Sequence, residues 1–258
     1  MRGFLLSGLG VLAMLAVSLD ARAADLAPVS KAPPVVPAFN WTGFYLGANA
    51  GYEWARNTDR ITAVNDFSGL VGGNYIATSL PIEANGFVGG GQAGYNWQIS
   101  PLWVAGLEAD IAWTDIHGSV SLPGPNDDSR IMTGTQRLDW LGTARGRLGI
   151  VPADRTLLFV TGGFAYGHGS LSTALTRNTG CANSNCQNGS TSGNLTGWTV
   201  GGGAEWAFAA NWSAKAEYLY YDLGSLSHLM TDPKFPSIFR ARADFTGHIA
   251  RLGVNYRF

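Results

Sequence analysis

The sequence feature that most restricts the fold is a two-residue alternation that recurs in eight separate segments. In the last of them, residues 248–258, one face is apolar and ends in Tyr256 and Phe258, whereas the other face carries Arg251 and Arg257. This period predicts a β-strand. A soluble sandwich would bury the apolar face, whereas a transmembrane barrel turns it toward lipid and turns the polar face toward the lumen. Repetition of the pattern decides between them.

The other seven segments repeat the alternation, with aromatic, alanine and glycine residues on one face and charged or amide residues on the other. The eight predicted strands are residues 44–54, 86–98, 102–115, 136–150, 156–169, 195–208, 211–222 and 248–258. The strand at 156–169 is apolar on both faces at its start, so the sequence does not decide which of its faces points toward the lumen. An even number of strands lets an antiparallel barrel close. The predicted fold is all-β, an eight-stranded antiparallel up-and-down transmembrane β-barrel.

The connections between these strands alternate in length. Those after the second, fourth and sixth strands are tight, whereas the others are roughly 20–30 residues long and polar, as in outer-membrane barrels with short periplasmic turns and long extracellular loops. This arrangement predicts that both chain ends lie in the periplasm. Aromatic residues concentrate near the strand ends, as two interfacial rings require. The predicted location is the outer membrane of a Gram-negative cell.

The N-terminal residues read as an export signal. An apolar run at 4–19 follows Arg2 and leads to the small residues Ala21 and Ala23, which predicts a signal peptide over 1–23 rather than a membrane anchor. Residues 24–40 are rich in proline and alanine and predict an extended periplasmic leader. Residues 41–258 form the predicted barrel domain.

Composition limits the partners and cofactors. The 17 Lys and Arg residues nearly balance the 18 Asp and Glu residues, which argues against nucleic acid as a partner. The two cysteines, Cys181 and Cys186, lie in a polar loop, and in an exported chain such a pair predicts a disulfide. No further Cys or His lies beside them, so neither a metal site nor a cofactor is expected.

The most informative residues are the charged side chains predicted to face the lumen. All lie at a similar distance from the tight turns or the chain end. They are Glu108, Asp110, Arg145, Arg147, Glu205, Lys215, Glu217 and Arg251. They could form the charged constriction of a pore or a salt-bridged plug. The interior of an eight-stranded barrel is only wide enough for its own side chains, which favours the plug.

Two His-Gly-Ser segments suggest an alternative chemistry. His117 and Ser119 follow Asp115 at one strand end, and His168 and Ser170 lie at another. A base beside a nucleophile is what acyl transfer needs, and the spacing resembles the site of an outer-membrane lipid A deacylase. The same residues are also common where a strand enters a loop, and no oxyanion-stabilising arrangement is recognisable. We therefore expect no enzyme.

Three segments together resemble a known family. They are Asn40-Trp-Thr-Gly-Phe-Tyr-Leu-Gly-Ala-Asn49, the glycine-rich second strand, and the terminal Arg-Leu-Gly-Val-Asn-Tyr-Arg-Phe. They are similar to the small outer-membrane β-barrel proteins of alphaproteobacteria, the Omp25/Omp31-like "porin family" group, over about residues 40–258. The resemblance implies that Tyr256 and Phe258 form the signal read by the barrel-assembly machinery. It implies no catalytic residues.

The expected function is therefore structural. We expect a monomeric barrel that supports envelope integrity, contacts outer-membrane lipid and lipopolysaccharide, and presents loops to an unidentified surface ligand. A small low-conductance porin is the alternative, and a lipid-modifying enzyme is a more remote one.

Overall fold

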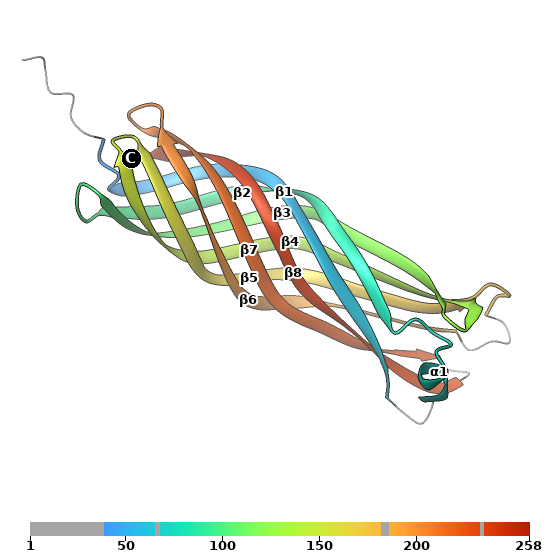
Figure 1. The fold of residues 1–258 in the computed structure, drawn as a ribbon. Coiled ribbons are helices and arrows are strands. Elements are labelled where there is room, and N and C mark those ends of the chain that lie inside the picture. The colour runs from blue at the N-terminus through green and yellow to red at the C-terminus, as the bar shows by residue number, and fades with distance from the viewer. Residues whose placement is uncertain (1–38, 65–67, 182–185, 233–234) are drawn as a thin grey trace, which may run out of the picture. The chain divides into compact units, whose positions relative to one another are not determined.

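Eight antiparallel strands close into a barrel in which each strand pairs with its neighbours in the chain and β1 pairs with β8 (Figure 1). The computed structural model describes residues 39–64, 68–181, 186–232 and 235–258. The elements are β1 (Gly43–Ala63), α1 (Ser68–Gly72), β2 (Ser79–Gln98), β3 (Trp103–Gly124), β4 (Asp127–Ala153), β5 (Thr156–Arg177), β6 (Gln187–Ala207), β7 (Trp212–Asp232) and β8 (Phe235–Arg257). The predicted up-and-down barrel is confirmed. The predicted signal peptide, 1–23, and all but the last two residues of the leader, 24–40, lie outside the described residues.

The half of the barrel next to the tight turns carries a lipid-facing band. There, outward side chains are apolar, and two rings of aromatic pairs border them, as expected where a barrel meets the membrane interfaces. The ring near the ends of the described barrel, Phe39 and Phe258 (called the chain ends below), includes Phe44–Phe258 (centroids 5.8 Å apart) and Trp212–Tyr256 (5.0 Å). The ring at the other border includes Trp54–Tyr218, Trp140–Tyr166 and Trp198–Tyr220. None of the described residues forms a helix long and apolar enough to cross a membrane.

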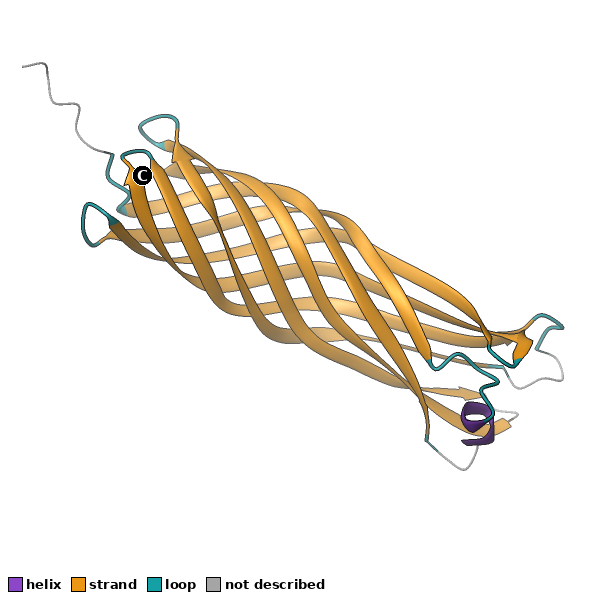
Figure 2. Ribbon diagram, in the orientation of Figure 1, coloured by secondary structure: helices purple, strands orange, loops and turns teal. Residues whose placement is uncertain are grey.

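The strands continue far beyond this band and make up most of the length of the barrel (Figure 2). They contain 20 to 27 residues, about twice the 9–11 that a tilted strand needs to cross the hydrocarbon. The prediction of long loops was wrong, because most of the residues assigned to these loops belong to strands. The reason is an inversion of polarity above the second ring: Arg56 and Arg60 of β1 point outward, whereas Ala55 and Ile61 point inward and are buried. The outer face here is as polar as a loop because it meets water.

The interior is filled in layers along the barrel axis. Near the chain ends, Trp41, Val104, Leu157, Phe159 and Ala207 form an apolar cluster. Two further apolar clusters occupy the lumen farther along: one of them includes Leu138, Leu141, Leu195, Leu219 and Phe245, and the other, at the far end, includes Ile61, Ile76, Leu80, Met132, Leu175, Met230 and Phe239. Leu157 and Phe159 of β5 point inward and are buried, whereas Leu158 and Val160 point toward the lipid. This answers the question, left open by the sequence, of which face of β5 lines the lumen.

Candidate functional site in the barrel lumen

Eight charged side chains meet at one level of the lumen, within the part of the barrel that carries the lipid-facing band. Each occupies an inward position of its strand and is nearly fully buried. They are Glu108 and Asp110 on β3, Arg145 and Arg147 on β4, Glu205 on β6, Lys215 and Glu217 on β7, and Arg251 on β8. The structure thus places all of the predicted lumen residues in one layer, where four carboxylates face four cations.

Strand register brings opposite charges together. Three opposite-charge pairs stand directly across from one another on neighbouring strands: Glu108 and Arg145, Glu205 and Lys215, and Glu217 and Arg251. Directly opposed residues on one face of a sheet are close enough for their side chains to interact. The first and the third of these pairs form ion pairs, with N···O distances of 2.5 and 2.7 Å.

Arg145 is the centre of the layer. Its Nη2 donates to Glu108 (2.5 Å) and Asp110 (2.8 Å), and its Nη1 donates to Glu217 (2.7 Å). Arg251 approaches two of these three carboxylates from β8, at 2.9 Å from Asp110 and 2.7 Å from Glu217. These contacts tie together four strands, β3, β4, β7 and β8, across the lumen. A buried charge is stable only when it is paired and hydrogen-bonded, and this geometry meets that condition.

The same layer has a second set of contacts nearer the chain ends. Arg147 donates to Glu205 (2.8 Å), and the Lys215 ammonium donates to both oxygens of Glu108 (2.8 and 2.9 Å). The guanidinium of Arg147 also lies 4.2 Å from the centroid of the Phe159 ring, a cation–π geometry. This contact joins the charge layer directly to the apolar cluster beneath it.

Tyr45 belongs to this layer, although the sequence did not single it out. Its hydroxyl donates to Glu108 (2.7 Å) and accepts from Arg147 (3.0 Å). A side chain at Gly94 would have its Cβ 2.3 Å from the Tyr45 hydroxyl, so glycine is required at that position. The available signal was the alternation itself: Phe44 points outward, and the next residue must therefore point inward.

Neutral amides complete the polar layer between β1, β2 and β8. Asn49 donates to Gln92 (3.1 Å), and Gln92 donates to Asn255 (2.5 Å). Asn255 in turn donates to Glu205 (2.8 Å). The two-residue alternation places these three amides on the inward face of their strands, but their connection to the charges depends on the register of the barrel.

Two further buried carboxylates, Glu53 and Asp59, lie on β1 farther from the chain ends. Tyr221 donates to one oxygen of Glu53, and Gln136 donates to one oxygen of Asp59. The second oxygen of each carboxylate has no hydrogen-bond partner. Among the described residues, no cation lies within ion-pairing distance of either. Burial raises the pKa of Asp59 to about 6, and the nearby Asp244 carboxylate adds to this effect, whereas the Gln136 hydrogen bond opposes it.

Because the pKa of Asp59 is raised in the folded barrel, we expect the free energy of unfolding to depend on pH. Because the folded-state pKa lies above the ordinary carboxyl value, the stability that protonated Asp59 contributes is present in acid and is lost as pH rises through about 6. Asp59→Asn should therefore be about 1–3 kcal/mol more stable than the natural protein at pH 8, with little or no gain at pH 4. Urea titrations in detergent at both pH values measure this. Asp128→Asn, an exposed aspartate at the same end, is the control, and an equal gain from it would contradict the prediction.

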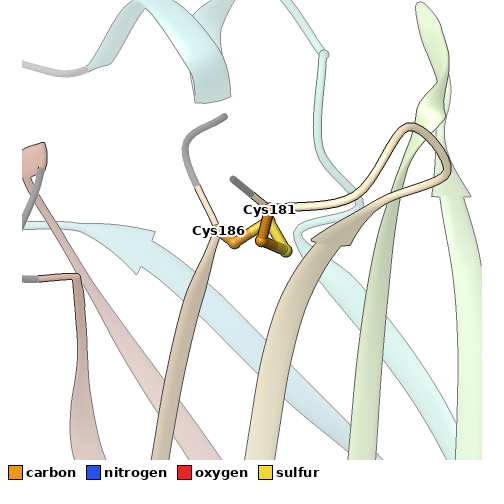
Figure 3. The surroundings of a disulfide bond; sticks show 2 residues. All are labelled: Cys181 and Cys186. Carbon is orange, nitrogen blue, oxygen red and sulfur yellow. A yellow bond between two sulfur atoms is a disulfide. The ribbon is translucent and has the colours of Figure 1, made fainter. Parts of the chain in front are cut away.

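The two cysteines form a disulfide between the end of β5 and the start of β6 (Figure 3). The Cys181–Cys186 bond closes the connection between these strands at the end of the barrel opposite the chain ends, as predicted. The apolar cluster that contains Leu175 fills the interior at this end. The disulfide therefore belongs to the rim of the barrel and not to the charge layer.

The histidine–serine segments do not assemble a nucleophile and a base. The Nδ1 atom of His117 lies 3.1 Å from the backbone oxygen of Asp115, and that of His168 lies 3.0 Å from Asn194. Within the part of the chain that the structure describes, neither histidine is hydrogen-bonded to the serine two residues on. The described residues also hold no group of three or more His, Cys, Asp or Glu side chains placed to bind a metal ion.

A closed eight-stranded barrel with a lipid-facing apolar band and a charged, filled lumen is a transmembrane barrel of the outer-membrane type. The sequence agrees, since residues 9–258 match the outer membrane protein β-barrel domain family. The chain belongs to this family. It is an outer-membrane protein.

Two relatives with known names support this assignment and the resemblance inferred from the sequence. The chain is 34% identical over 251 residues to the 31 kDa outer-membrane immunogenic protein of Brucella melitensis, covering 96% of this chain and 97% of that protein. It is 27% identical over 226 residues to the 22 kDa outer membrane protein of Rhizobium leguminosarum bv. viciae, covering 87% and 82%. Both relatives carry names of outer-membrane proteins and not of enzymes.

A solved structure shares the fold. The outer membrane protein OprG from Pseudomonas aeruginosa has a TM-score of 0.50 and 12% sequence identity, covering 86% of this chain and 98% of that one. At this identity the likeness concerns the barrel alone and not what passes through it or binds to it.

Proposed function

We propose that the protein is a non-enzymatic, non-conducting barrel that supports the integrity of the outer membrane and presents its extracellular half as an interaction surface. The observation that carries this proposal is the filled lumen. The charge layer centred on Arg145 lies between the apolar cluster of Trp41 and Phe159 and the apolar cluster of Leu138 and Leu219. An ion would have to displace paired, buried charges and then cross an apolar interior that offers it few ligands.

The orientation that we propose for the barrel in the membrane follows from the position of its tight turns. The first and last strands pair near their ends, with Tyr45 opposite Arg257, so both ends of the barrel domain lie beside the tight turns. In outer-membrane barrels these turns are periplasmic. The long polar-faced halves of the strands then lie outside the cell, where a surface ligand would meet them. We propose a monomer, inserted by the barrel-assembly machinery through the signal at Tyr256 and Phe258.

Conductance in planar lipid bilayers tests the closed lumen. The natural protein should give no stable channel. Arg147→Ala should raise the leak conductance, because the vacated space between Glu205 and the Phe159 ring admits water to a charged layer. Arg137→Ala, which removes an exposed arginine, is the control and should stay silent. A stable, ion-selective conductance of the natural protein would overturn the closed lumen and establish a low-conductance porin instead. Mass spectrometry of lipid A from cells that express the protein tests for lipid-modifying activity. We expect the lipid A to be unchanged.

A further inference from the structure

The pairing of β1 and β8 is interrupted just beyond the lipid-facing band. Backbone pairs run continuously as far as Trp54 opposite His248 and resume, in the same register, at Arg60 opposite Arg242. Between these points, the Asn57 side chain donates to the backbone oxygen of Thr246 (3.2 Å) and accepts from its hydroxyl (2.9 Å). The two strands, which lie side by side in Figure 1, are therefore joined here by side chains instead of a ladder.

A groove of about 450 Å³ lies on the outer surface of this interruption. Its lining residues come from β1, β2 and β8: Trp54, Ala55, Arg56, Glu83, Asn85, Thr246 and His248. The Trp54 and His248 rings are stacked, with centroids 6.0 Å apart and planes at 16°. The Tyr218 hydroxyl is hydrogen-bonded to His248 Nδ1 (2.6 Å). The groove thus has an aromatic wall and polar groups at the height where a barrel surface leaves the hydrocarbon.

Arginines surround the groove on the side away from the membrane. Arg56, Arg60, Arg240 and Arg242 all point outward on β1 and β8. Arg60 and Arg242 stand directly opposite each other, an arrangement that is unfavourable for like charges. Two acids offset part of this charge, since Glu83 lies 3.1 Å from Arg56 and Asp244 lies 3.7 Å from Arg242.

The other two arginines, Arg60 and Arg240, are not offset by a nearby acid in the part of the chain that the structure describes. Neither Arg60 nor Arg240 has a carboxylate within 4.0 Å among the described residues. By contrast, the outward residues of β5 and β6 above the aromatic ring are mostly serine, threonine and asparagine. The positive charge is therefore concentrated on one side of the barrel and faces the surroundings of the groove, where an anion would satisfy it.

A second groove lies within the lipid-facing band, on β1, β2 and β8 and also on β6 and β7. Its volume is about 790 Å³, and its floor is made of small outward residues flanked by larger ones: Ala50, Gly202, Ala216 and Ala250 lie between Tyr52, Phe87, Tyr218 and Leu252. Tyr52 stands opposite Ala250, two residues before the Trp54–His248 pair that borders the upper groove. A molecule with apolar chains and a polar head could therefore occupy both grooves in succession.

We propose that this outer face of β1 and β8 binds a glycolipid of the outer leaflet. Its acyl chains would lie in the lower groove, its sugar headgroup against Trp54 and His248, and its anionic groups against Arg60 and Arg242. Three independent features support this: an apolar groove at the depth of acyl chains, an aromatic wall of the kind that packs against sugar rings, and arginines at the depth of the headgroup, of which Arg60 has no carboxylate within 4.0 Å among the described residues. The proposal concerns the outer surface and does not depend on whether the lumen conducts.

Binding of purified lipopolysaccharide to the barrel in detergent micelles tests the site. Arg60→Ala/Arg242→Ala should weaken binding about tenfold or more, because two charge-assisted contacts are lost. The matched control is Arg137→Ala, which removes an exposed arginine of β4 paired with Asp139 and should bind as the natural protein does. Folding of each variant is checked by the shift in electrophoretic mobility between unheated and boiled samples.

A second pair of variants tests the lower groove without removing charge. Ala250→Phe fills its floor and should weaken binding, whereas Ala144→Phe, a lipid-facing change on β4 away from both grooves, should not. Equal losses from each variant and its control would overturn the site. Competition by inorganic phosphate or phosphatidylglycerol at the same concentrations as lipopolysaccharide would overturn the glycolipid as its ligand. Bilayer conductance of the same variants reports separately on the lumen, so either proposal can fail alone.

Discussion

Replacing Arg145 with methionine is expected to destabilise the barrel by about 3–5 kcal/mol. Methionine fills much of the same volume, but the change removes the one cation that pairs with Glu108, Asp110 and Glu217 together. The layer is then left with four buried carboxylates and three cations. An excess buried charge must be either solvated in a closed interior or neutralised by taking up a proton, and both cost free energy. Urea titration of refolding in lipid vesicles measures the loss.

A double-mutant cycle shows whether this loss arises from the charge or from packing. Glu108→Gln combined with Arg145→Met returns the layer to three carboxylates and three cations. The pair should therefore cost less than the sum of the single changes, by about 0.5–3 kcal/mol. Arg137→Met is the control, because its ion pair with Asp139 is largely exposed and should be worth less than about 1 kcal/mol. Strict additivity of the two lumen changes would show that Glu108 and Arg145 do not act as partners.

Replacing Leu107 with arginine is expected to cost about 2–4 kcal/mol. Leu107 points outward on β3 with 59% of its surface exposed, and it lies between Trp103 and Trp113, which mark the two borders of the lipid-facing band. A cation at this depth meets hydrocarbon, because the lumen is on the other side of the strand and cannot reach it. The cost is measured by the same refolding titration.

The control for Leu107 is a position on the same strand and the same face. Ser119 also points outward on β3, but it lies beyond Trp113 in the part of the barrel whose outer face is polar. Ser119→Arg should change the free energy of unfolding by less than about 1 kcal/mol, since the cost of a charge falls toward the interfaces. If the two arginines cost the same, the assignment of the lipid-facing band would be wrong.

Much of the barrel follows from local alternation. The two-residue period and the tight turns predict eight strands, and the aromatic positions predict the depth of the membrane, because each depends only on which face of a strand a residue occupies. The outer halves of the strands were missed for a physical reason. Above the second ring, the outer face meets water and the inner face meets an apolar interior, so the segment around Thr133 and Thr135 has the composition of a loop although Met132 and Leu138 are buried.

The alternation along each strand is enough to assign which charges point into the lumen, and four of these are positive and four negative. Glu108 and Arg145 lie on adjacent predicted strands, and the register places them directly opposite each other. The contacts across the lumen were decided by the tertiary structure alone: Arg147 with Glu205, and Arg251 with Asp110. These distances depend on the stagger between strands around the closed barrel, a property of all eight strands together that no single segment encodes.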